Sequence, residues 1–166
     1  MLFRSKLHEL CHEMERYKWN VLGLAEVRWP NTGEILTEKG HKIWYSGEPK
    51  KHERGVAFLV HKDNLQSVLE CRPVSGRLMS IRLEATPRNI LIMQVYAPTS
   101  TAAENEIEAF YDELETLTSQ TPKHDILIVQ GDWNAKIGTD AYADWAGTTG
   151  NFGCGQTNER VLRLLE

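Results

Sequence analysis

The stretch Ile-Leu-Ile-Val-Gln-Gly-Asp-Trp-Asn-Ala, residues 126–135, joins an apolar run to an acid and an amide. Residues 125–130 are short, apolar and rich in β-branched side chains, which predicts a buried strand that ends at Gly131. Asp132 and Asn134 follow, and the two-residue repeat of a strand would place both side chains on one face. Because sites in α/β proteins gather at the carboxyl ends of strands, the stretch predicts functional oxygens at a sheet rim. The alternative is an ordinary Asx turn after a strand.

Two earlier apolar segments also end in polar groups. Residues 20–27 predict a buried strand with Glu26 near its end, and residues 89–96 predict another that ends in Tyr96. A carboxylate beside a buried strand needs a partner, which is a metal ion, the nearby Arg28 or solvent. A tyrosine in this place can orient a phosphate, although such a residue is more commonly part of the core with its hydroxyl satisfied.

Three expected strands therefore deliver polar oxygens at their carboxyl ends. Carboxylate and amide oxygens are hard ligands that suit a divalent cation, and an amide also donates to a phosphate oxygen. That several strands end in this way is a stronger indication of a site than any one of these residues. The residues are Glu26, Tyr96, Asp132 and Asn134.

The rest of the chain alternates helical and strand-like patterns, which predicts an α/β or α+β layered fold. Residues 7–17 have the apolar spacing of an amphipathic helix, and residues 28–38 are expected to form a loop. A run of short strands then predicts an antiparallel meander; it comprises residues 41–46, 55–61, 67–72, 77–84 and 89–96.

A second helix is expected after Ala97 and Pro98. Thr101 and Glu104 have the spacing of a capping box, and Pro122 is expected to close the helix. Residues 136–157 are rich in glycine and are expected to be irregular, and a helical pattern starts at Asn158.

Length and composition fit one globular domain over residues 1–166. The net charge of −4 gives no bulk electrostatic reason to expect a nucleic-acid partner, although local patches can override it. No run reaches the roughly 18 apolar residues of a membrane helix, and the N-terminus has no apolar signal core. The three separated cysteines fit a reducing compartment. We therefore expect a nuclear or cytoplasmic protein that is not secreted.

Two other motifs offer competing interpretations. His8-Glu-Leu-Cys-His12 matches the H-E-x-x-H pattern of zinc proteases, but Glu15 stands where the extended motif has glycine. The apolar stripe of Leu7, Leu10, Met14 and Tyr17 favours an ordinary packing helix there. Lys50, Lys51, His52 and Arg54 form a small basic cluster that can meet phosphates, although a solvated hairpin is the better interpretation.

Four motifs in order carry a resemblance to a known family: residues 22–29, 54–58, 94–99 and 131–138. In this order they resemble the endonuclease/exonuclease/phosphatase superfamily, which includes deoxyribonuclease I and apurinic/apyrimidinic endonucleases. The match looks closest to the endonuclease domains of non-LTR retrotransposons and to the related craniofacial development protein 2-like proteins.

The resemblance implies a four-layer α/β sandwich that hydrolyses phosphodiesters in DNA with Mg²⁺ or Mn²⁺. Glu26 then matches the metal-binding glutamate, and Tyr96 matches the tyrosine on the phosphate side of the site. Asp132 matches the acid that orients or deprotonates the attacking water, and Asn134 matches the amide that holds the phosphate. Arg28 stands where a basic residue near the phosphate is often found.

The sequence also departs from the family pattern at both ends. The family begins with a strand that carries an asparagine and finishes with an aspartate and an Asp-His pair, and residues 1–166 match neither part. We therefore expect an incomplete sandwich with exposed sheet edges that favour association, and little or no nuclease activity. The alternatives are a catalytically dead remnant that binds nucleic acid or protein, and a phosphoesterase of the same superfamily that acts on small substrates.

Overall fold

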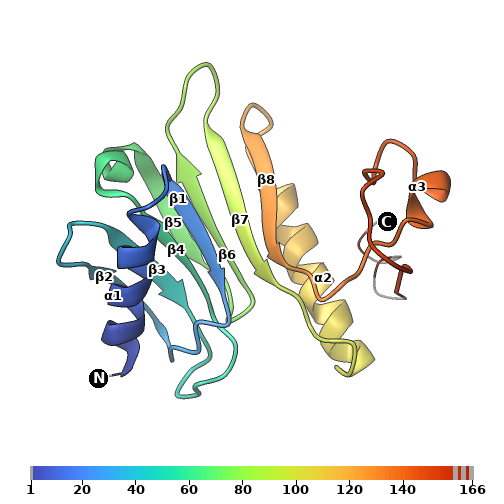
Figure 1. Ribbon diagram of the computed structural model, residues 1–166, viewed down its shortest axis with the longest axis horizontal. Helices are drawn as coiled ribbons and strands as arrows, with labels where there is room; N and C mark the ends of the chain where they lie inside the picture. Colours follow the sequence, from blue (N-terminus) through green and yellow to red (C-terminus); the bar gives the residue numbers. More distant parts are fainter. Residues whose placement is uncertain (1, 159–160, 162–163, 165–166) are drawn as a thin grey trace.

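The chain folds into four layers in the order helix, sheet, sheet, helix, as the computed structural model shows for residues 2–158, 161 and 164 (Figure 1). Helix α1 (Leu2–Met14) covers the outer face of the first sheet. Helix α2 (Glu104–Ser119) covers the outer face of the second sheet. The expected four-layer α/β sandwich is thus confirmed.

The first sheet has the strand order β1-β4-β3-β2, and every neighbouring pair is antiparallel. Its strands are β1 (Val21–Ala25), β2 (Thr32–Leu36), β3 (Lys42–Ser46) and β4 (Val56–Val60). The expectation of a loop over residues 28–38 is wrong, because β2 pairs with β3 from Thr32↔Ser46 to Leu36↔Lys42. β2 is an edge strand whose residues alternate between exposed and half-buried. Turn-forming residues such as Gly33 hide this alternation in the sequence.

The second sheet has the order β5-β6-β7-β8. Its strands are β5 (Val68–Pro73), β6 (Leu78–Leu83), β7 (Ile90–Tyr96) and β8 (Ile126–Asp132). β8 runs parallel to β7, and α2 forms the crossover between them. The expected single meander is wrong, because its strands belong to two different sheets. The short 3-10 helix η1 (Lys62–Ser67) connects β4 of the first sheet to β5 of the second.

The start of α2 also differs from the expectation. The helix begins at Glu104 with Ala103 as its N-cap, and no side chain caps it. Thr101 therefore forms no capping box; its hydroxyl lies 3.1 Å from that of Thr99. The helix ends before Pro122, as expected. Residues 136–158 are irregular apart from the short helix α3 (Ala141–Asp144), and the helical pattern from Asn158 lies largely outside the described residues.

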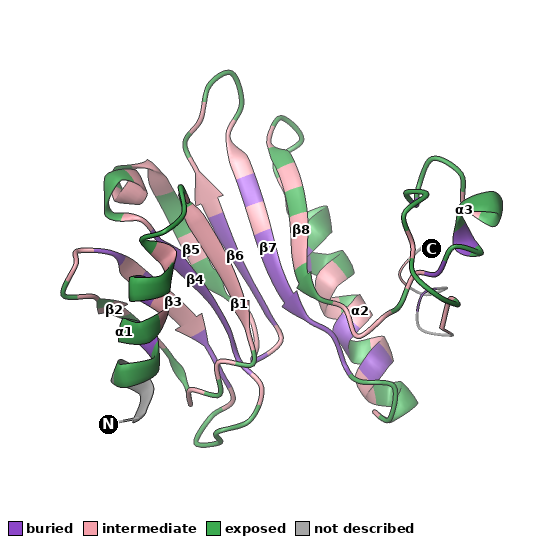
Figure 2. Ribbon diagram, in the orientation of Figure 1, coloured by how far each residue is buried: buried purple, intermediate pink, exposed green. Residues whose placement is uncertain are grey.

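Three apolar cores separate the four layers. β4 has a continuous apolar sequence without alternation because both of its faces are buried (Figure 2). The core under α1 contains Leu7, Cys11, Ile43, Ala57 and Leu59. The core between the sheets contains Val56, Phe58, Val60, Met79, Ile81 and Tyr96. The core under α2 contains Leu78, Leu91, Met93, Val95, Ala97, Phe110 and Leu117.

Shortening Ile43 tests how tightly the core under α1 is packed. Ile43 is 1% exposed, so the substitution Ile43→Val removes one fully buried methyl group. We expect the free energy of unfolding to fall by about 1 kcal/mol in urea denaturation. The same substitution at Ile126, which is 45% exposed, should change it by less than about 0.5 kcal/mol. Equal losses at the two positions would contradict the packing described for this core.

Two apolar side chains of β8 lie exposed. Ile126 and Ile128 are 45% and 41% exposed, while Leu127 and Val129 on the opposite face pack toward α2. In the part of the chain that the structure describes, β1 and β8 are edge strands of their sheets. The expected association through exposed edges stays a prediction. Within the same part of the chain, no helix is both long enough and apolar enough to cross a membrane.

A cluster of three rings lies where β4 ends and β1 begins. His41 and His61 have ring centroids 4.6 Å apart, and the ring of Trp19 lies 5.0 Å from each. His41 is buried, and its Nδ1 accepts a hydrogen bond of 3.1 Å from the backbone N–H of Lys62. Burial lowers the pKa of His41 from its ordinary 6.5, and electrostatic interactions with His61, Lys62 and Lys39 lower it further, against a smaller rise from Asp63.

This cluster predicts a loss of stability in mild acid. As the pH falls through 6.5, the unfolded chain takes up a proton on His41 while the folded chain resists it. The free energy of unfolding should therefore fall between pH 7 and pH 5. His41→Asn, which keeps an acceptor for the N–H of Lys62, should weaken this dependence in urea denaturation. His124→Gln, at an exposed histidine, should leave it unchanged, and a steep pH dependence that survives in His41→Asn would refute the assignment.

Candidate functional site at the strand ends

The polar residues singled out in the sequence gather at one rim of the sandwich. Glu26 follows β1, Tyr96 ends β7 and Asp132 ends β8. Tyr96 and Asp132 are register partners in the parallel β7–β8 pair, and the N–H of Ala97 donates to the carbonyl of Asp132 at 2.8 Å. β1 lies across the sandwich against both β7 and β8, which brings Glu26 to the same rim.

Glu26 is the centre of a hydrogen-bonded group. The hydroxyl of Tyr96 donates to Oε1 of Glu26 at 2.8 Å, and Nη2 of Arg28 donates to Oε2 at 3.0 Å. The Tyr96 side chain is buried between the sheets, whereas the Glu26 side chain is 47% exposed. The carboxylate therefore faces solvent while a buried phenol holds it from behind.

These contacts set the ionisation of both partners. The hydrogen bond from Tyr96 lowers the pKa of Glu26, and the hydrogen bond and charge of Arg28 lower it further, so Glu26 is a carboxylate at neutral pH. Burial raises the pKa of Tyr96, and the hydrogen bond to Glu26 raises it further. The phenol thus stays protonated and acts as a donor.

The backbone at this rim is strained. Glu26, Arg28 and Asn134 have φ values of 55°, 54° and 48°, in the left-handed region. Asparagine adopts this region readily, whereas glutamate and arginine rarely do. The conformation costs on the order of 1–3 kcal/mol at each of Glu26 and Arg28. Backbone hydrogen bonds hold the first two: Val27 N–H to Gly55 O at 3.1 Å and Arg28 N–H to Arg54 O at 2.7 Å. Strain of this kind concentrates at functional sites.

Asp132 and Asn134 are placed by a turn rather than by strand alternation. β8 continues to Asp132 instead of ending at Gly131, and the chain leaves the sheet directly afterwards. Oδ1 of Asp132 accepts the N–H of Asn134 at 3.0 Å, so the Asx turn considered as the alternative is present. Nδ2 of Asn134 then donates to the carbonyl of Ala97 at 2.8 Å and ties this turn to the end of β7.

The donor chemistry of the rim suits a hydrated cation. Mg²⁺ usually keeps several waters and is bound through one or two carboxylates, so it does not need a closed protein cage. Glu26 offers one exposed carboxylate. No three His, Cys, Asp or Glu side chains in the described ranges come together as a cage for a metal ion. An open cavity of about 750 Å³ extends from Glu26 and Arg28 toward α1, with Trp29 and His52 in its wall.

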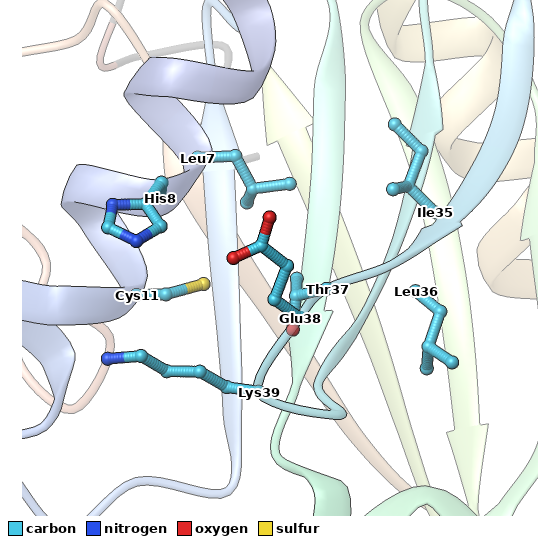
Figure 3. Close-up of a pocket in the computed structure, with 8 residues that line it drawn as sticks. All are labelled: Leu7, His8, Cys11, Ile35, Leu36, Thr37, Glu38 and Lys39. Atoms are coloured by element: carbon cyan, nitrogen blue, oxygen red, sulfur yellow. The ribbon is translucent and has the colours of Figure 1, made fainter.

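The histidine motif of α1 lies apart from this rim. His12 pairs with Glu15 at 3.4 Å, and His8 lines a separate pocket of about 150 Å³ between α1 and the β2–β3 connection (Figure 3). Cys11 and Lys39 line the same pocket. Over the part of the chain described, no third ligand joins the two histidines, so the zinc-protease interpretation has no structural support.

The structure brings in two residues that sequence reasoning missed, Arg77 and Glu106. Nη1 of Arg77 donates to the carbonyl of Tyr96 at 3.0 Å, and Nη2 donates to Glu106 at 2.6 Å. These partners lie 19 and 29 residues from Arg77 along the chain, so no local pattern marks them.

Comparisons with known proteins agree with this fold. No protein-family model matches the chain. It is 40% identical over 162 residues to craniofacial development protein 2 of Bos taurus and 38% identical to that of Tragulus javanicus. Each alignment covers 98% of this chain, but the chain spans only about a quarter of the relatives' length (27% and 28%).

Solved structures of similar fold include two endonucleases and TDP2. The endonuclease domain of TRAS1, a telomere-specific non-LTR retrotransposon, gives a TM-score of 0.59 at 16% identity over 95% of this chain and 61% of that chain. D. rerio TDP2 complexed with single-strand DNA product gives 0.56 at 13% identity, over 86% and 57%. The AP endonuclease LMAP from Leishmania major gives 0.56 at 16% identity, over 81% and 52%.

Proposed function

We propose that this chain forms the metal-binding side of a DNA phosphodiesterase site. It has the endonuclease/exonuclease/phosphatase fold, and its sequence is similar to that of craniofacial development protein 2. The observation that carries this proposal is the hydrogen bond from the Tyr96 hydroxyl to Glu26. It lies at the rim where Tyr96 and Asp132 are register partners in the β7–β8 pair. The DNA product bound by the TDP2 structure supports nucleic acid as the substrate class.

In this proposal Glu26 holds Mg²⁺ or Mn²⁺ through its exposed carboxylate. Such an ion, when bound, neutralises charge on a phosphate oxygen. Tyr96 keeps the carboxylate ionised and oriented by donating to it. Arg28 fixes the other carboxylate oxygen and brings positive charge to the place where a phosphate would approach.

In the same proposal, Asp132 acts on the attacking water and Asn134 acts on the phosphate. One oxygen of Asp132 is used by the turn, and the second orients an attacking water and accepts its proton. Asn134 uses one N–H of its amide to hold Ala97, and its second N–H donates to a phosphate oxygen. We propose that these residues bind DNA in a metal-dependent way, and that any cleavage depends on Asp132.

Two measurements on the same protein test this proposal. Fluorescence anisotropy of a labelled DNA duplex should rise more with Mn²⁺ than with EDTA, and any nicking of supercoiled plasmid should vanish in Asp132→Asn. Asp144→Asn, at an exposed acid of α3, is the matched control and should change neither readout. DNA binding that ignores the metal, or nicking that persists in Asp132→Asn, would overturn the proposal. Faster release of phosphate from a small phosphoester than nicking of DNA would favour a phosphoesterase.

A further inference from the structure

Four charged side chains form a connected cluster beside the rim: Glu48, Arg54, Arg77 and Glu106. Arg54 pairs with Glu106 and, at 3.4 Å, with Glu48, while Nη2 of Arg77 lies 2.6 Å from Oε1 of Glu106. The cluster joins the loop before β4, the residue before β6 and the first turn of α2. The side chain of Arg77 is only 12% exposed, so its pair with Glu106 is largely shielded from solvent.

Arg77 connects this cluster to Tyr96 by three contacts. Its Nη1 donates to the carbonyl of Tyr96 at 3.0 Å, and its own carbonyl accepts the N–H of Tyr96 at 2.8 Å. Its guanidinium carbon also lies over the Tyr96 ring, 5.3 Å from the centroid. The backbone and the ring of Tyr96 are therefore both held by one side chain.

We propose that Arg77, fixed by Glu106, is a positioning residue that aims the Tyr96 hydroxyl at Glu26. The role requires arginine, because a planar guanidinium can donate to Tyr96 and Glu106 in two directions while it covers a ring, and a lysine ammonium cannot. The consequence for catalysis rests on the proposed function, whereas the positioning of Tyr96 does not.

The hydrogen bond from the Tyr96 hydroxyl to Glu26 reports on this positioning. The three contacts of Arg77 are with the backbone and the ring of Tyr96, so an Arg77 variant would change that hydrogen bond by moving Tyr96. A cluster that only fastened α2 to the sheets would leave this hydrogen bond unchanged in a folded variant.

NMR of the metal-free protein separates these cases, because the chemical shift of the Tyr96 ring carbon that bears the hydroxyl responds to the hydrogen bond of that hydroxyl. Loss of this signal in Tyr96→Phe assigns it, and we expect Arg77→Gln to move it toward the signal of the exposed Tyr17. Glu106→Gln, which keeps Arg77, should shift it in the same direction and carries the test if Arg77→Gln does not fold. Because no metal or DNA is present, failure of the proposed function would leave this result intact.

The control is a second arginine, which lies on β6 itself. Arg82 pairs with Asp125, with Nε 2.6 Å from Oδ2, and its register partner on β7 is Leu91, near the opposite end of that strand from Tyr96. Arg82→Gln should therefore leave the Tyr96 signal where it is. The proposal is overturned if a folded Arg77→Gln or Glu106→Gln leaves that signal unchanged.

Discussion

The substitution Gly131→Ala is expected to lower the free energy of unfolding by roughly 2–6 kcal/mol, from the combined cost of overpacking and an unfavourable φ. Gly131 lies inside β8 with φ of 143°, and a Cβ there would come 2.0 Å from the carbonyl oxygen of Val95. That oxygen belongs to the backbone of β7, so it cannot rotate away as a side chain would. The β7–β8 pair would have to separate next to Asp132, one residue from the rim.

Two other glycines separate the causes of this loss in urea denaturation. Gly147 has φ of 90° with nothing within 4 Å of the added Cβ, so Gly147→Ala measures the backbone cost alone. Gly150 also has open space, and its φ is not in the left-handed region, so Gly150→Ala should change little. If Gly131→Ala costs no more than Gly147→Ala, the close approach of β7 and β8 at Gly131 is wrong.

Much of the fold was predictable because most strands are apolar and bounded by turn residues. β4 and β8 are examples, since both are short apolar runs that end near a polar residue. β2 was not predictable, because it is an edge strand with one solvent-exposed face. Its strand conformation depends on pairing with β3 rather than on its own composition. The assignment of strands to two sheets likewise depends on η1, whose sequence carries no sign of a change of sheet.

The candidate site was also predictable only in part. Polar residues at the ends of apolar strands can be seen in a sequence, and Glu26, Tyr96 and Asp132 do meet at one rim. Their supporting contacts cannot be seen, because Arg77 reaches Tyr96 through the pairing of β6 with β7 and reaches Glu106 through the packing of α2. The left-handed backbone at Glu26 was also hidden, since glutamate gives no hint of a positive φ.

Removal of the Glu26 carboxylate has the largest expected effect on metal binding. Loss of an outer-shell partner costs about 10- to 100-fold in metal affinity, so Glu26→Gln, which removes the proposed ligand itself, should weaken Mn²⁺ binding by about 100-fold or more. Tyr96→Phe removes only the hydrogen bond behind the carboxylate and should cost about 10-fold. Water-proton relaxation measures the Mn²⁺ dissociation constant without any need for DNA or cleavage.

The pH dependence and a second glutamate make this prediction specific. Because the pKa of Glu26 is lowered, Mn²⁺ binding should persist below the pH at which an ordinary glutamate takes up its proton, and it should be lost only as Glu26 is protonated. Glu34 on β2 is the matched control: its pKa is lowered by Lys42, yet it lies on the edge strand farthest from β1. Glu34→Gln should bind Mn²⁺ like the unmodified chain. If Glu26→Gln does so as well, the metal is held elsewhere and the roles proposed for Tyr96 and Arg28 lose their basis.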